Sequence, residues 1–175
     1  PALKFVTGVI INLRITGGSG TVLLDSGSTV SANIDMLGAR GARLEIEAGA
    51  TVNAADVTLD SGRLISYEEL ATVTQFGGMV DMRNVDGTIT TYDLYQGTCK
   101  YKPTGAAVLT TLNNYGGFFD MRGCPSPSHT ITTVIMYAGS MIDERNGLTN
   151  TIYTNPITVN GGIIKCDLGR TVTVV

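Results

Sequence analysis

The feature that most constrains the fold of this chain is a glycine-bounded repeat. Glycines divide the 175 residues into an opening stretch of 20 residues, seven segments of 16 to 23 residues and a shorter tail, with coils expected to end near Gly20, Gly41, Gly62, Gly78, Gly97, Gly117, Gly139 and Gly162. Each segment opens with a short run of alternating apolar and polar residues, as at 43–46 and 118–121, which is typical of a strand. Repetition of this kind indicates stacked coils, because one coil cannot bury its apolar face alone.

A second strand follows in each segment, and it has a Val or Ile at its centre. These residues are Val30, Val52, Val73, Ile89, Val108, Ile131, Ile152 and Val172. The preceding residue is Thr in seven of the eight segments, and Ala107 is the exception. We expect the eight residues to form one core column, stacked at the roughly 4.8 Å spacing of neighbouring strands. A third apolar piece, as at 92–95 and 134–137, completes three short strands per coil.

The sequence therefore predicts an all-β fold, a right-handed parallel β-helix of about eight short coils that forms a single domain over residues 1–175. Glycines at the corners supply positive φ angles. The alternative is an antiparallel β-sandwich or jelly roll, in which turns also recur about every 8–12 residues. A sandwich does not need the same column in every segment.

Only residues 66–71 have the pattern of a helical turn.

Composition excludes several functional classes. The 12 basic and 15 acidic residues give a net charge of −3, so we expect no nucleic-acid partner. No run of 18 apolar residues occurs, which predicts no membrane partner, and the first residues lack the pattern of a secretory signal. We expect a nearly complete chain made in a cytosol. Cys99, Cys124 and Cys166 have no CxxC spacing, which indicates neither a disulfide framework nor a zinc site.

Residues with catalytic potential are sparse. His129 is the only histidine, and it follows a Pro- and Ser-rich segment without a recognisable nucleophile motif, so we expect it to lie in a solvated loop. Cleavage of a glycan needs two carboxylates that face one groove, or an acidic calcium site beside a basic residue. The acidic residues here occur mostly one per coil. We therefore predict no catalytic residue, no metal site and no cofactor.

Charged residues align when the first strands are registered on their glycines. One outward column contains Asp81, Lys100 and Asp120, and a second contains Arg83, Lys102 and Arg122. The first column is interpreted as a ladder of surface ion pairs between neighbouring strands. The second is either part of the same solvated face or a basic stripe. Because like charges in register repel, an acidic partner or an anionic glycan would stabilise that stripe, which makes it the candidate contact site.

Threonines recur as Thr-x-Thr at 72–74, 88–90, 130–132 and 171–173. Stacked Thr pairs resemble the ice-binding face of insect-type antifreeze proteins. Ser31, Asn53, Leu109 and Tyr153 interrupt the second Thr column, so a regular lattice is not expected. High β-propensity and pairing between rungs explain the threonines without ice binding, which remains the less favoured function.

Residues 77–83 and 116–122 share the motif Gly-Gly-x-apolar-Asp-apolar-Arg, and each is followed by Thr-Ile-Thr and a Tyr-containing strand. These coils resemble those of uncharacterised tailed-phage virion proteins, over residues 77–165 and more loosely over the first 60. The resemblance implies a non-enzymatic structural protein located in the virion: a capsid decoration or cement protein, a head fibre or a receptor-binding tip. We expect a capsid decoration protein in the first place, because the sequence shows no separate head-binding segment or coiled coil. It implies the major capsid protein or another virion protein as partner.

A function of a different class stays open. A glycan-binding or glycan-cleaving β-helix would need an aromatic-lined groove, which tyrosines would supply; these are Tyr92, Tyr95, Tyr101, Tyr115, Tyr137 and Tyr153. Self-association is expected in either case, because terminal coils expose strand edges and residues 170–175 contain no polar cap. We expect a homo-oligomer, a trimer by analogy with other assembled solenoids.

Overall fold

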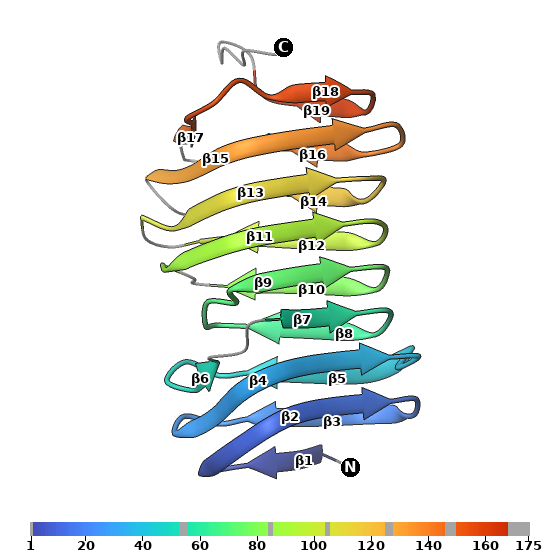
Figure 1. Cartoon of the computed structure of the whole chain (residues 1–175), viewed down its shortest axis with the longest axis vertical. Helices are drawn as coiled ribbons and strands as arrows, with labels where there is room; N and C mark the ends of the chain where they lie inside the picture. Colours follow the sequence, from blue (N-terminus) through green and yellow to red (C-terminus); the bar gives the residue numbers. More distant parts are fainter. Residues whose placement is uncertain are drawn as a thin grey trace.

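The computed structural model describes residues 2–52, 56–83, 86–103, 106–124, 128–145 and 150–167. These residues form a right-handed parallel β-helix of about seven turns, in which two sheets run along the length of the stack (Figure 1). The strand pairs in the described ranges are all parallel. The predicted solenoid is confirmed, and the antiparallel sandwich is wrong. Residues 66–71, expected to form a helical turn, contain the end of a strand and a loop instead.

The first sheet has nine strands, one from the start of each predicted segment. In spatial order they are β1 (Ala2–Phe5), β3 (Ser19–Leu24), β5 (Gly41–Ile46), β8 (Arg63–Ser66), β10 (Met79–Arg83), β12 (Thr98–Lys102), β14 (Phe118–Asp120), β16 (Met141–Asp143) and β19 (Ile163–Lys165). Apolar side chains of these strands point inward at every second residue, as the period of a strand requires.

The second sheet has ten strands. Eight of them follow one another as β2 (Gly8–Thr16), β4 (Ser28–Leu37), β7 (Asp56–Leu59), β9 (Thr72–Gln75), β11 (Thr88–Leu94), β13 (Val108–Asn114), β15 (Ser128–Tyr137) and β17 (Asn150–Tyr153). The short strands β6 (Thr51–Val52) and β18 (Thr158–Asn160) pair with β4 and β15.

Three separate strands per coil were expected, but the second and third pieces of several coils form one bent strand. In β11, Ile89 and Tyr92 are buried whereas Thr90 and Thr91 between them face outward. Two consecutive outward residues break the alternation and turn the strand around the core. In β4 three residues, 31–33, are exposed or half-buried between the buried Val30 and Ile34, and the pairing with β2 is irregular at this point.

A small residue lies at the start of each strand of the nine-stranded sheet from β3 onward, at the same corner of successive coils: it is the second residue of β3 and β5 and directly precedes the later strands. The strand register aligns Gly20, Ala42, Gly62, Gly78, Gly97, Gly117, Ser140 and Gly162 at this corner. Gly78 and Gly97 have φ angles of +69° and +87°, and a Cβ on either would clash with the carbonyl oxygen of the corner residue one coil below. Close approach between coils therefore selects glycine here. The predicted boundaries Gly41 and Gly139 lie one residue before this corner.

Aliphatic stacking builds the core, but in several short columns. Val30 pairs with Ile10 on one side and with Val52 on the other, and Val73 pairs with Val57 and Tyr92. Val30 and Val73 are fully buried, and Val52 is partly buried against the core.

The prediction of one continuous column is wrong: Val73 belongs to a different column from Ile89, because it pairs with Tyr92, and two further members face outward. Ile89 and Ile131 are fully buried and both pair with Leu109, whereas Val108 and Ile152 pair with the outward residue Thr130. Val108 is half-buried and Ile152 is 49% exposed. Relative to Ile89 and Ile131, the predicted Val or Ile of these two coils is shifted by one residue, and a shift of one residue moves a side chain to the opposite face of a strand. Val172 lies outside the described residues.

Polar side chains inside the core hold the glycine corner. The Gln75 Nε2 donates to the carbonyl oxygens of Gly77, Gly78 and Thr98 at 3.1–3.2 Å, and its Oε1 accepts a hydrogen bond of 2.6 Å from the Tyr92 hydroxyl. Gln75 and Tyr92 are both fully buried. Buried carbonyl groups of the turn are thereby satisfied without water.

Tyr92→Phe is expected to lower the free energy of unfolding by about 1–3 kcal/mol, because it leaves the buried Gln75 Oε1 without its donor. Tyr101→Phe is the matched control, since the buried Tyr101 hydroxyl has no hydrogen-bond partner among the described residues. Its removal should cost less than about 0.5 kcal/mol. Chemical denaturation of both variants measures the difference, and equal losses would contradict this role of Tyr92.

Candidate functional site

The outer face of the nine-stranded sheet carries regular columns of charge. Strand register aligns Glu45, Ile65, Asp81, Lys100, Asp120, Asp143 and Lys165 in one column. Arg83 and Lys102 are paired in the next outward column, and Arg122 lies two residues beyond Asp120 on the following strand. The structure thus brings both predicted sets of charged residues together on one face.

The carboxylates of this face are buried, which corrects the prediction of a surface ladder. The side chains of Asp81, Asp120 and Asp143 are only 3%, 7% and 2% exposed. Each binds an arginine two residues further along the chain, at 2.7 Å for Asp81 to Arg83. Residues i and i+2 share one face of a strand, so Arg83 folds back over Asp81 within β10. Arg122 and Arg145 lie two residues past the ends of β14 and β16 and fold back over the last residue of the strand. The ion pairs therefore form mainly within one coil rather than between Asp and Lys of neighbouring strands.

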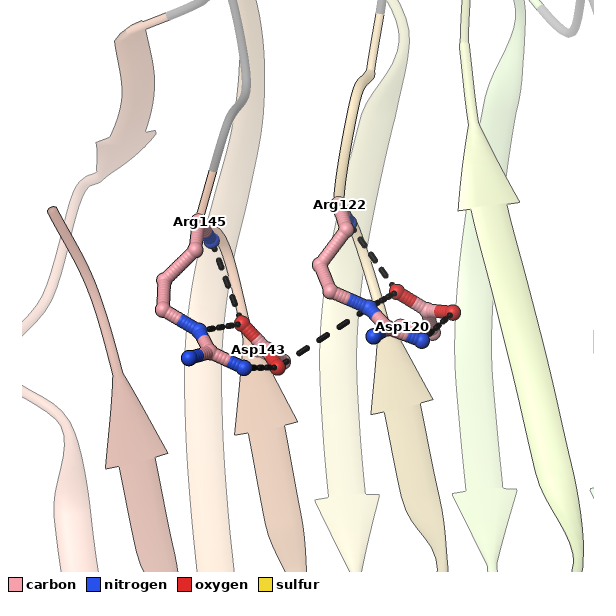
Figure 2. Close-up of polar contacts among 4 residues, drawn as sticks. All are labelled: Asp120, Arg122, Asp143 and Arg145. Atoms are coloured by element: carbon pink, nitrogen blue, oxygen red, sulfur yellow. Dashed lines mark hydrogen bonds and ion pairs between the residues drawn. The ribbon is translucent and has the colours of Figure 1, made fainter.

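Figure 2 shows the two pairs at the C-terminal end of this ladder. Arg122 donates from Nε and Nη2 to the two oxygens of Asp120 at 2.8 and 2.9 Å, and its backbone N–H donates to the same carboxylate. Arg145 binds Asp143 in the same way. The Arg122 Nε also lies 3.8 Å from Asp143, which joins neighbouring rungs.

The sequence did not predict Arg63 or the pair Asp143 and Arg145 as parts of this ladder. Arg63 lies 3.2 Å from Asp81, so this carboxylate has an arginine from its own strand and one from the preceding rung. The pair at 143–145 was missed because no Gly-Gly precedes it, although it repeats the Asp-x-Arg spacing of residues 81–83 and 120–122. That spacing was the available signal.

The arginines keep these carboxylates ionised. Burial by itself would raise the pKa of Asp81, but the hydrogen bond and charge of Arg83, with help from Arg63 and Lys100, outweigh it and lower the pKa. Asp120 follows the same balance with Arg122. For Asp143 the hydrogen bond from Arg145 is the largest cause, and its pKa is also lowered.

Acidification is expected to destabilise the fold through these three carboxylates. A folded-state pKa below the unfolded value means that their stabilising effect is complete above about pH 4 and is lost as the pH falls through the folded-state pKa. Asp120→Asn should lower stability at neutral pH by about 1–3 kcal/mol and make the acid dependence shallower. Thermal melts from about pH 6 down to about pH 2 test this. Parallel curves for wild type and variant would contradict it.

The predicted basic stripe is partly neutralised. Arg83 and Arg122 are both bound to carboxylates, yet their side chains stay 41% and 46% exposed. The Arg122 guanidinium also lies 5.3 Å from the centre of the Phe118 ring. Among the described residues from β8 to β16, the outer face has three more basic than acidic residues. The acidic ones are Asp81, Asp120 and Asp143, and the basic ones are Arg63, Arg83, Lys100, Lys102, Arg122 and Arg145. An excess of positive charge therefore remains on this half of the sheet.

Four aromatic rings stack where the strands of the ten-stranded sheet end. Centroid distances are 4.9 Å from Phe76 to Tyr95, 4.5 Å from Tyr95 to Tyr115 and 4.8 Å from Tyr115 to Tyr137, with the planes within 22° of parallel. The ring faces that stack on each other are covered, so a sugar cannot stack on those faces. Tyr92 and Tyr101 are buried in the core, and Tyr153 is half-buried. The stack is therefore a stabilising element of the coil.

Threonines do align, but in a column other than the predicted one. Thr91 pairs with Thr72 and Thr111, and Thr111 pairs with Thr133. In the next outward column Asp93 and Asn113 replace threonine, and their side chains are hydrogen-bonded to each other at 2.8 Å. The paired Thr lattice of an ice-binding face is thus interrupted.

His129 is buried rather than solvated, which corrects the expectation for this residue. It is 1% exposed, its Nε2 lies 3.1 Å from the Thr151 hydroxyl, and its ring meets Tyr101 edge-on. The Cys124 Sγ, also buried, lies 4.0 Å from Nδ1. His129 belongs to β15, where an inward side chain packs beneath the next coil. Such burial closes the imidazole to a substrate.

No protein-family model, curated protein or solved structure matches this chain. Within the described ranges, no helix has the length and apolar character needed to span a membrane. Three or more His, Cys, Asp or Glu side chains do not gather in a metal-binding arrangement in that part of the chain either.

Proposed function

We propose that this chain is a non-enzymatic structural protein of a phage virion, in the first place a capsid decoration or cement protein that acts by rigid β-helical assembly and adhesion. The observation that carries this proposal is the Asp–Arg ladder. Its carboxylates are buried beneath arginines of the same coil, and the contacts of Arg63 with Asp81 and of Arg122 with Asp143 join neighbouring coils. The virion context comes from the resemblance of the Gly-Gly-x-apolar-Asp-apolar-Arg coils.

The ionisation of the ladder argues against catalysis by these acids. A glycosidase needs a carboxylic acid whose pKa is raised, so that it is protonated when the substrate binds. The arginines lower the pKa of Asp81, Asp120 and Asp143, the opposite direction. Their burial also prevents contact with a sugar. The ladder thus supports cohesion and not proton transfer.

Apolar side chains of the first coils supply a surface for adhesion. Leu3, Val6, Val9 and Ile11 are 54–71% exposed. A contact with the major capsid protein, another virion protein or a further copy of this chain would remove these side chains from water. We accordingly propose a homo-oligomer on the particle surface. Three-fold symmetry is the arrangement taken from analogy.

Protein mass spectrometry of gradient-purified particles of the phage that encodes this chain tests the proposal. We expect the chain in intact particles, in the head fraction after heads and tails are separated. Recovery in the tail fraction would favour the receptor-binding version. Its absence from washed particles would overturn the virion role.

The glycan alternative keeps one supporting observation, the excess of basic residues between β8 and β16, which suits an anionic polysaccharide. A reducing-end assay on a panel of acidic polysaccharides separates the two functions. We expect no release of reducing ends, and reproducible turnover would end the structural proposal.

A further inference from the structure

The outer face of the nine-stranded sheet changes sign along the stack. Its N-terminal rungs contain three carboxylates, Asp25, Glu45 and Glu47, against two basic side chains, Lys4 and Arg43. From β8 onward basic side chains outnumber acidic ones. A face with one acidic and one basic half can bind a copy of itself if the copy is inverted.

The two most complementary groups occupy equivalent positions along their strands. Glu45 on β5 and Lys100 on β12 belong to one column, with Ile65 on β8 and Asp81 on β10 between them. Glu47 and Lys102 each lie two residues further along, on the same face. Both strand ends therefore carry a pair of like charges at matching places.

The charges of Glu45 and Glu47, and those of Lys100 and Lys102, are not fully compensated by opposite charges in their own rung. Glu45 binds Arg43 at 2.7 Å, but Glu47 lies beside Asp25, whose carboxylate raises the pKa of Glu47. The strand β12 has the sequence Thr-Cys-Lys-Tyr-Lys and contains no acidic residue. Opposite charge brought from outside would stabilise both ends of the face.

A hollow at the acidic end offers space for such a charge. It has a volume of about 340 Å³ and is lined by Glu45, Glu47, Ala48 and Tyr67. Two carboxylates and a phenol at its wall suit an ammonium or guanidinium group.

We propose that two copies of this chain associate face to face through the nine-stranded sheet, about a two-fold axis parallel to the strands and midway between β8 and β10. The axis inverts one copy relative to the other and places β5 of each opposite β12 of its neighbour. Glu45 and Glu47 then face the partner's Lys100 and the partner's Lys102. Two-fold symmetry repeats this contact, so both sets of charges are compensated.

This inference stands independently of the virion role and makes a different prediction from three-fold analogy. In a ring of solenoids with parallel axes, β5 of every copy lies level with β5 of its neighbours. If this face lined the axis of such a ring, glutamates would meet glutamates. A mass of two chains whose stability depends on these four residues therefore points to the inverted pair.

Charge reversal tests the pairing. Two double variants, Glu45→Lys/Glu47→Lys and Lys100→Glu/Lys102→Glu, each place like charges opposite each other, so each alone should be monomeric, with the dimer dissociation constant raised about tenfold or more. Mixed in equal amounts, the two variants should form a heterodimer, because each supplies the charge that the other lacks. The quadruple variant should dimerise with itself. Analytical ultracentrifugation at low and high salt measures all four samples beside wild type.

Arg14→Glu/Arg40→Glu is the control for Lys100→Glu/Lys102→Glu, since it makes the same change in net charge at exposed sites outside this sheet. It should leave the dimer intact, and circular dichroism verifies that every variant is folded. A monomeric wild type, or a dimer or trimer unaffected by the double reversals, would overturn the proposal. Heparin is the probe for the competing occupant: a monomeric wild type that binds heparin through Lys100 and Lys102 would assign the basic half to a polyanion instead.

Discussion

Replacing Ile89 or Ile131 with aspartate is expected to prevent this chain from folding. Both side chains are fully buried, and each pairs with Leu109 in the stacked core. A carboxylate at either position would be dehydrated without a basic partner, at a cost of at least about 5 kcal/mol, comparable with the whole stability of a typical domain. Circular dichroism should show loss of the β signal, and heating should give no cooperative transition.

Ile152→Asp is the matched control for this substitution. Ile152 carries the same Thr-Ile motif in sequence, but it is 49% exposed. The change should shift the free energy of unfolding by less than about 0.5 kcal/mol. Soluble, cooperatively melting Ile131→Asp protein would show that the stacked column does not sustain the fold.

Gly97→Ala should be the next most damaging single substitution. The φ angle of +87° disfavours any residue with a Cβ, and the added methyl group would clash with the Gly78 carbonyl oxygen and lie 2.9 Å from Gln75 Nε2. Backbone strain and the clash together should cost about 3 kcal/mol or more, or a melting temperature lower by roughly 6–12 °C.

Gly139→Ala separates the two causes. Its φ angle of +85° is nearly the same, but a Cβ there meets nothing within 4 Å. This variant should lose only about 1 kcal/mol. Calorimetry that found equal losses for both glycines would mean that backbone strain alone, and not the contact between coils, decides the corner.

The sequence was sufficient to predict the coil because coil boundaries depend on backbone geometry that few residues satisfy. Glycines such as Gly78 and Gly97 are required where one coil touches the next, so their spacing indicates the turns directly. The inward column was harder to assign. A Thr-Val motif fits either face of a strand, and the bend at Thr90 and Thr91 changes the alternation in a way that hydrophobicity does not reveal.

The sequence predicted the register of the charged face but not its ion-pair partners. Its register followed from the glycines, which placed Asp81, Lys100 and Asp120 together. The partners did not follow, because a lysine on the next strand and an arginine two residues along compete for the same carboxylate. Geometry favours the arginine, whose planar fork reaches both oxygens, as Arg122 does on Asp120. His129 was misjudged for a related reason, since its position inside β15 is set by the neighbouring strands.

The Asp-x-Arg pairs of 120–122 and 143–145 have a consequence for how a chain of this type changes length. Each strand carries its own neutralising cation within two residues. Duplication or deletion of one whole coil would therefore leave no uncompensated buried carboxylate. In a ladder whose acid and base lie on different strands, loss of one coil would leave a charge without its partner. In this chain, gene segments of about 20 codons can be gained or lost with little electrostatic penalty.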